Sequence, residues 1–307
     1  MKQTKRTKPI NKTRVLFILC TIIFPILNFL VFYVYTNISS VAMAFIGKDG
    51  GFSLGNFAYI FRELASETSK IREAFRNTFI TFGVLVLMFP FKVLLSYFIY
   101  KKVPGYSFYR IVFFFPTIIF SVATALVFQQ VVGVESAIAK GVQEWMGLSY
   151  TPELLADSRF ANATIIGQLI WFGLPGDLII WGGTFARIPE DVLESGRIDG
   201  TNWWSEFTKI IVPLVWPTVS LQMVLLVCGI FGASGAVFLL TGGEYGTMTI
   251  PSWMYITLLN STAGGNMGDS HALNDVSAFG FLISSVAIII SLTVRRWTDK
   301  AFANVEF

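Results

Sequence analysis

Residues 79–100 read FITFGVLVLMFPFKVLLSYFIY, and Lys92 is the only charged side chain among them. A helix needs about 20 apolar residues to cross a hydrocarbon core of roughly 30 Å, and this run is long enough. Pro90 would damage a soluble helix, but helices packed within a membrane tolerate proline. The stretch therefore predicts a membrane-spanning helix.

Five more apolar runs have a similar length, so the chain is predicted to be an all-α integral membrane protein with six transmembrane helices. The other runs cover 15–35, 111–132, 164–186, 215–238 and 276–294. Hydrophobic residues make up 54% of the 307 residues and charged residues 14%, whereas soluble domains carry about 25% charge. This composition excludes a disordered chain and argues against a soluble enzyme. The small net charge of +4 argues against a partner nucleic acid.

The basic residues indicate the orientation of the spans. Residues 1–14 carry six Lys and Arg and no acid. A cleaved signal peptide is the alternative, but the apolar run that follows is too long for one. With the N-terminus inside, 15 of the 23 Lys and Arg fall in cytoplasmic segments and 7 in outer ones, which favours an N-in/C-in topology. We expect a basic cytoplasmic N-terminus (1–14), one transmembrane domain (15–297) and a cytoplasmic tail (298–307).

Two outer segments have distinct compositions. Residues 54–61 are rich in aromatic side chains and are expected to lie along the outer membrane interface. Residues 241–275 are rich in Gly, Ser, Thr and Asn, lack Lys and Arg, and are predicted to form an external loop.

Enzyme signatures are absent from the sequence. The chain has no G-x-x-x-x-G-K-[ST], H-E-x-x-H or G-x-S-x-G motif. His271 is the single histidine, and Cys20 and Cys228 each lie alone in an apolar run. These residues predict no metal site and no catalytic cluster.

The segment between the fourth and fifth predicted spans contains the most informative motif, IPEDVLESGRIDG, at residues 188–200. Pro189 suits the first turn of a helix, Glu190 and Asp191 suit the positive end of its dipole, and Asp199-Gly200 would end it. A second short helix through Trp203, Trp204 and Phe207 would lead into the next span. The segment could be a helix pair resting on lipid, or a docking element for a cytoplasmic partner.

The spacing in this segment resembles the EAA motif of ABC importer permeases, E-A-A-x3-G-x9-I-x-L-P. The matching residues are Glu194, Ser195, Gly196, Gly200, Ile210, Val212 and Pro213. Ser195 and Gly196 replace the two alanines and Val212 replaces leucine, all of which are conservative changes in size.

Further stretches resemble the sugar-uptake branch of that family, which includes maltose and multiple-sugar permeases. They are 56–61, 74–78, 113–116 and 240–243, and the likeness covers roughly residues 14–297. It implies the fold of a type I importer permease in the cell membrane, with a cytoplasmic coupling loop at 188–213. It also implies the import of a sugar or oligosaccharide by alternating access.

The resemblance implies partners and residue roles as well. A second related permease or another copy of this chain, two cytoplasmic ATPase subunits that bind ATP and Mg, and an external sugar-binding protein would complete the complex. This chain would need no cofactor of its own. Glu194 would dock in the ATPase, Ser195 and Gly196 would permit close approach, and Asp199 and Gly200 would form the turn.

The substrate pathway has candidates of its own. Leu174-Pro175-Gly176-Asp177 should weaken the fourth predicted span near its middle, and broken helices often mark transporter substrate sites. A carboxylate at membrane depth is costly. Lys92 lies about 12 Å and Asp177 about 14 Å from the cytoplasmic ends of their spans, so the two can pair. Alternatively, Lys92 reaches the inner surface with its long side chain, and the interruption is a packing kink in which a neighbour satisfies Asp177. Gln130 could contact sugar hydroxyls, or lie at a solvated helix end.

Two other functions fit parts of the sequence. A self-sufficient secondary transporter would use Asp177 and Lys92 as ion-coupling groups. A non-transporting assembly or receptor subunit would need neither residue. Both leave the spacing of 188–213 unexplained.

Overall fold

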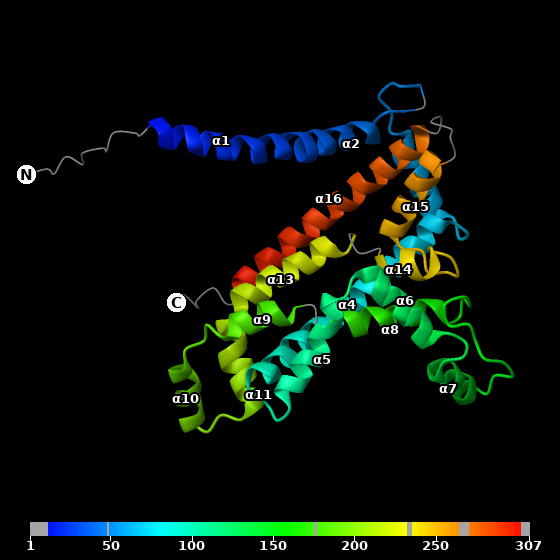
Figure 1. Ribbon diagram of the computed structural model, residues 1–307. Helices are drawn as coiled ribbons and strands as arrows, with labels where there is room; N and C mark the ends of the chain where they lie inside the picture. Colours follow the sequence, from blue (N-terminus) through cyan, green and yellow to red (C-terminus); the bar gives the residue numbers. More distant parts are fainter. Residues whose placement is uncertain (1–11, 48, 175–176, 232–234, 264–269, 302–307) are drawn as a thin grey trace, which may run out of the picture.

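The computed structural model describes residues 12–301, apart from 48, 175–176, 232–234 and 264–269. Its described part is helical, in agreement with the predicted all-α class (Figure 1). The helices are α1 (Lys12–Asn28), η1 (Phe29–Tyr35), α2 (Thr36–Ala44), α3 (Gly55–Ala65), α4 (Lys70–Tyr100), α5 (Tyr106–Ile118), α6 (Ser121–Val132), α7 (Ala137–Met146), α8 (Ala161–Gly173), α9 (Leu178–Phe185), α10 (Glu190–Ile198), α11 (Trp203–Glu206), η2 (Phe207–Ile211), α12 (Val212–Leu214), α13 (Trp216–Gly229), α14 (Gly235–Thr241), α15 (Ile250–Ala263) and α16 (Ser270–Ala301).

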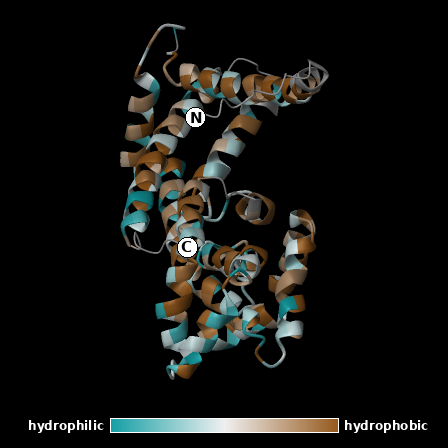
Figure 2. Cartoon of the chain, turned by 90° about the vertical axis from the view of Figure 1, so that its left-hand side faces the viewer, coloured by the Kyte–Doolittle hydropathy of each residue, from teal (hydrophilic) through white to brown (hydrophobic). Residues whose placement is uncertain are grey.

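Four helices in the described residues are long and apolar enough to cross a membrane, and six spans result if each of two bent helix pairs counts as one. Hydrophobic residues predominate along the helices (Figure 2), and many large ones are exposed, as expected for side chains that face lipid. The chain is a multi-pass membrane protein.

The first helix runs further than predicted. The expected span 15–35 continues through η1 and α2 to Ala44, and its apolar window is unburied. The α1 end projects away from the other helices, whereas α2 packs against α16 (Figure 1).

The third predicted span is bent rather than straight, and the fifth begins at a bend. Residues 111–132 divide into α5 and α6, and the chain bends by 111° between them. Pro116 removes one helical hydrogen bond, and Ile119 and Phe120 adopt extended backbone. Residues 215–238 divide into α13 and α14, and α13 is bent by 76° from the helices before it. The second bend lies at Val215, between Pro213 and Pro217.

The fourth predicted span is interrupted where the sequence predicted a weak helix. α8 ends at Gly173 and α9 begins at Leu178, while Pro175 and Gly176 lie outside the described residues. The sixth span, 276–294, lies within the longer α16.

The prediction of an external loop at 241–275 is wrong in one respect, because the segment contains α15. This helix packs against α4 and α16. Its 14 residues are too few to span a membrane, so a search for long apolar runs does not find it. The aromatic stretch 54–61 lies mostly in α3, which buries Ile60 and leaves Phe61 exposed.

The end of the molecule that is predicted to face outward, called the outer end below, is fastened by an outer amide network, formed by Asn56, Asn77, Asn162 and Asn274. The Asn77 amide donates to the carbonyl oxygens of Gly246 (2.8 Å) and Met248 (2.9 Å). The Asn162 amide donates to Asn77 Oδ1 (2.9 Å), which joins α8 to α4. Asn56 and Asn274 both donate to the Ile46 carbonyl. Neutral amides thus hold the loops to the helices at this end, together with Glu73, whose Oε1 accepts from the Met248 N–H at 3.1 Å.

The opposite end, which is predicted to face the cytoplasm and is called the inner end below, has a different core, built from apolar and aromatic side chains of α4, α9, α10, η2 and α13. Its buried members include Val93, Tyr97, Trp181, Phe185, Leu193, Phe207, Ile211 and Val215. Aromatic rings meet at its centre, where Tyr97 lies 5.1 Å from Phe207 and 6.4 Å from Phe185 between ring centroids. This core joins the 188–213 segment to α4 and α9.

Candidate functional site

The segment 188–213 forms the predicted pair of short helices. Pro189 precedes the first residue of α10, and Glu190 and Asp191 occupy the first turn. The helix ends at Ile198, and Gly200 turns the chain with a φ of +71°. The predicted stop at Asp199-Gly200 is therefore confirmed, and glycine suits this left-handed conformation.

α10 has one packed face and one exposed face. Leu193 and Gly196 are buried, whereas Glu194, Ser195 and Asp199 are exposed. A Cβ atom at position 196 would lie 2.8 Å from Ile210 Cδ1, so a small residue allows α10 to approach η2. The exposed face carries the acids that the sequence singled out, and they are available to a partner.

The second short helix contains a buried acid that the sequence analysis missed. Only 5% of the Glu206 side chain is exposed, and its Oε1 lies 2.6 Å from Lys101 Nζ. The Tyr97 hydroxyl donates to the same oxygen at 3.2 Å. Glu206 is the only acid between two tryptophans and a phenylalanine, which is a signal that could have identified it.

The proposed contact between Lys92 and Asp177 is present. Lys92 Nζ lies 3.2 Å from Asp177 Oδ2, and the side chains are 13% and 33% exposed. Asp177 directly precedes α9, so the pair links the interruption of the fourth span to the middle of α4. We call the pairs Lys92–Asp177 and Lys101–Glu206 the inner ion-pair network.

The other pathway candidates lie apart from this pair or cannot be placed. Gly176 lies outside the described residues. Gln130 is exposed near the end of α6. Its neighbour Gln129 donates to the carbonyl oxygen of Leu239 in α14, at 3.3 Å.

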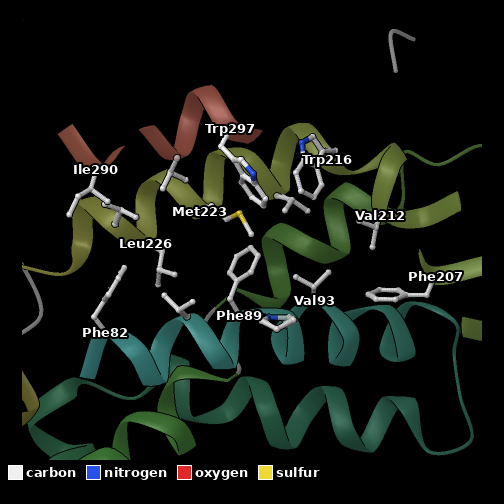
Figure 3. A pocket seen from close by; sticks show the side chains of 15 residues that line it. Phe82, Phe89, Val93, Phe207, Val212, Trp216, Met223, Leu226, Ile290 and Trp297 are labelled. Carbon is white, nitrogen blue, oxygen red and sulfur yellow. The ribbon is translucent and has the colours of Figure 1, made fainter. Parts of the chain in front are cut away.

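An apolar cavity of about 560 Å³ lies between α4 on one side and α13 and α16 on the other (Figure 3). Phe89 and Val93 line it from α4, and Trp216, Met223 and Trp297 face them. A sugar needs several polar partners in its site, and this lining offers few. The cavity is therefore not suited to hold a sugar.

A more polar cavity of about 730 Å³ lies at the outer end, between the α2–α3 connection, α15 and α16. Its polar and aromatic lining includes Asp49, Asn56, Tyr59, Arg62, Trp253 and Asp275. Burial raises the pKa of Tyr59, and the nearby Glu63 and Asp275 raise it further, so this phenol stays neutral. Among the described residues, no three His, Cys, Asp or Glu side chains gather as metal ligands.

The sequence is similar to those of several transport permeases. No family model matches the chain. It is 36% identical over 109 residues to the osmoprotective compounds uptake permease protein GgtC of Synechocystis, covering 34% of this chain and 38% of that protein. It is 21% identical over 285 residues to the alpha-glucoside transport system permease protein AglF of Rhizobium meliloti, covering 88% and 77%.

The solved structures are similar over almost the whole chain. A bacterial ABC transporter involved in the import of the acidic polysaccharide alginate matches with a TM-score of 0.74 at 20% identity, covering 92% of this chain and 96% of that one. The same transporter in complex with an alginate pentasaccharide-bound periplasmic protein matches equally well. The chain has the fold of an ABC importer permease. Within this permease fold, the helix pair 188–213 and the inner ion-pair network are the candidate sites.

Proposed function

We propose that the chain is the transmembrane subunit of an ATP-driven importer that moves a sugar or oligosaccharide into the cell by alternating access. The observation that carries this proposal is the match to an ABC importer permease over 92% of the chain. The names of relatives such as AglF support a sugar as the cargo.

In this proposal, α10 is the element that docks in the cytoplasmic ATPase. The resemblance of 188–213 to the EAA motif supports the assignment, and the exposed acids of α10 supply the contact. Glu194 would contact the ATPase directly, and Ser195 lies beside it. Gly196 would keep α10 close to η2, and Asp199-Gly200 would form the turn that ends the helix. ATP and Mg would be bound by the ATPase, since no P-loop occurs in this sequence.

The substrate would pass beside the interruption between α8 and α9. Polar groups at membrane depth are costly and commonly functional, and Lys92 with Asp177 provides such a pair at 3.2 Å. Gly176 stays a pathway candidate by its place in the sequence. Gln130 is the more peripheral candidate.

The complete importer would contain a second permease or another copy of this chain, two ATPase subunits and an external sugar-binding protein. The exposed apolar surface of the first helix supports a neighbour in the membrane, whether lipid or protein. The structural relative that was solved with its periplasmic protein supports the external partner.

A self-sufficient ion-coupled transporter is the second candidate. It is favoured by one observation, the pairing of two ionisable groups at membrane depth. In that case Lys92 and Asp177 would exchange a coupling ion, and the exposed face of α10 would have no partner.

The deciding experiment is reconstitution of the chain in vesicles with the ATPase with which it is co-expressed. We expect co-purification of the two proteins and ATP-dependent uptake, both lost on Glu194→Lys. Glu135→Lys is the matched control, since Glu135 is an exposed acid in a segment predicted to lie outside. Uptake driven by an ion gradient without ATP, together with unaltered behaviour of Glu194→Lys, would overturn the proposal.

A further inference from the structure

The cytoplasmic half of α4 is held on two sides. Lys92 pairs with Asp177 at the start of α9, and Lys101 pairs with Glu206 at the end of α11. Nine residues separate the two lysines, which is two and a half turns and places them on opposite sides of the helix, about 14 Å apart along it. Residues 92–101 therefore lie between the interrupted fourth span and the helix pair 188–213.

The Glu206 contact is buried and uses one carboxylate oxygen for two donors. Oε1 accepts from Lys101 Nζ at 2.6 Å and from the Tyr97 hydroxyl at 3.2 Å. Phe207, the next residue, packs on the Tyr97 ring. A buried carboxylate that loses such partners is strongly destabilised, so α11 cannot move far from α4 while this contact persists.

The same segment is tied to α10, the proposed docking helix. The buried Gly196 lies against Ile210, three residues beyond Phe207, and the Thr201 hydroxyl donates to the Gly196 carbonyl at 2.7 Å. Leu193 belongs to the same buried core as Tyr97 and Phe207. Displacement of α10 is thereby passed to η2 and α11 through packed contacts.

Two features mark the outer limit of this part of α4. Pro90, two residues outward of Lys92, lacks the N–H that would bond within the helix. The apolar cavity of about 560 Å³ separates Phe89 and Val93 from Trp216, Met223 and Trp297 (Figure 3). On this side Pro90 and Val93 line the cavity, whereas Lys92 and Lys101 are ion-paired toward α9 and α11.

We propose that Glu206 is a positioning residue, which fastens α11 to Lys101 so that movement of the 188–213 segment reaches the Lys92–Asp177 pair through the inner half of α4. The inference rests on the proposed function, because it assumes that an ATPase moves α10. It adds a second contact between the 188–213 segment and the spans, beyond the docking residues themselves.

The test measures how many substrate molecules enter per ATP hydrolysed, in vesicles that contain the complete importer. Glu206→Gln keeps the size of the side chain but removes its charge. We expect ATP hydrolysis to continue and the ratio to fall about ten-fold, the scale of a typical coupling between sites. A fall in uptake and hydrolysis in equal proportion, with an unchanged ratio, would overturn the proposal.

A second variant separates coupling from folding. Lys101→Met with Glu206→Gln removes both charges, so neither is left buried without its partner. The double variant is expected to accumulate like the unaltered protein and still to import few molecules per ATP. Recovery of the ratio in the double variant would show that the pair serves folding alone, and would overturn the proposal.

The control is the exposed pair Lys140–Glu135, whose charged atoms lie 3.2 Å apart, against 2.6 Å for Lys101–Glu206. Lys140→Met with Glu135→Gln should leave the ratio unchanged. If the unaltered importer shows no ATP-driven uptake, the proposed function fails, and that failure is visible before any Glu206 variant is compared.

Discussion

The outer and inner ends of this permease fold are held together by different chemistry. At the outer end, the amides of Asn56, Asn77 and Asn274 donate to main-chain carbonyls, and these bonds involve no charged group. At the inner end, charged side chains of α4 meet carboxylates beside α9 and in α11.

The difference has a physical consequence. An amide bonded to a buried carbonyl has no alternative partner in the apolar surroundings, so leaving it unmade is costly. An ion pair is also costly to separate, but its free energy changes with hydration and with nearby charge. The outer end is therefore built to stay in place, and the inner end is built from contacts whose strength can change between two states.

The largest expected effect is a loss of stability when the central residue of the outer amide network, Asn77, is replaced. Asn77→Ala removes a buried hydrogen bond to the Met248 carbonyl, a part-buried one to Gly246, and the oxygen that accepts from Asn162. A buried carbonyl left unsatisfied costs about 1–3 kcal/mol. We expect a clear fall in the melting temperature of the purified protein. Asn37→Ala is the control, because the Asn37 amide bonds only to the carbonyl four residues earlier. Equal melting temperatures for both variants would contradict the importance of the outer network.

The second prediction concerns the inner ion-pair network. Lys92→Ala or Asp177→Ala alone leaves a partner without its counter-charge, and each should lower transport about ten-fold, equivalent to about 1.4 kcal/mol. The double variant should be milder than the sum of the two, because contacting residues are coupled. Initial uptake rates of all four proteins test this, and strictly additive losses would argue that the two residues act separately.

A smaller effect is expected where the outer turn after α14 depends on glycine. Gly242 and Gly243 have φ values of +63° and +80°, and a Cβ atom at 243 would lie 2.8 Å from Met248 Sδ. Gly242→Ala should cost about 1–2 kcal/mol through its left-handed backbone alone, and Gly243→Ala should cost more. Melting curves of the two variants measure which one is less stable. A lower melting temperature for Gly242→Ala than for Gly243→Ala would disprove the steric argument.

The smallest effect is expected at an exposed outer pair, Asp157–Arg159. Hydrogen bonds from Arg159 lower the pKa of Asp157. A carboxyl with a lowered pKa stabilises the fold at neutral pH, and this contribution is lost as the pH falls through its folded pKa. Because the pair is exposed, Arg159→Ala should leave the melting temperature unchanged at pH 7. A marked fall in the melting temperature of Arg159→Ala at pH 7 that is absent at acidic pH would contradict this prediction. It would show that surface charge stabilises this end more than we infer.

Much of the fold was predictable because membrane depth imposes strict chemistry. A run of about 20 apolar residues is a physical requirement of a span. The similar depth of Lys92 and Asp177 allowed a pair, and the structure selects the pair over a lysine that reaches the inner surface. The stop of α10 at Gly200 was equally readable, because few residues other than glycine adopt its backbone conformation.

The rest depended on tertiary contacts that hydropathy does not record. The 111° bend between α5 and α6 occurs in an apolar run, where nothing in the average composition marks it. α15 is too short to be recognised as a span. Asn77 and Glu206 act through partners 169 and 109 positions away in the sequence, so neither could be assigned a role from its neighbours.

The most direct test of the contrast between the two ends is hydrogen–deuterium exchange of the complete importer, with and without a trapped nucleotide. We predict that exchange changes in residues 91–101 and 203–211 and stays constant in 74–78 and 246–250. Equal changes at both ends, or a change confined to the outer end, would contradict the account.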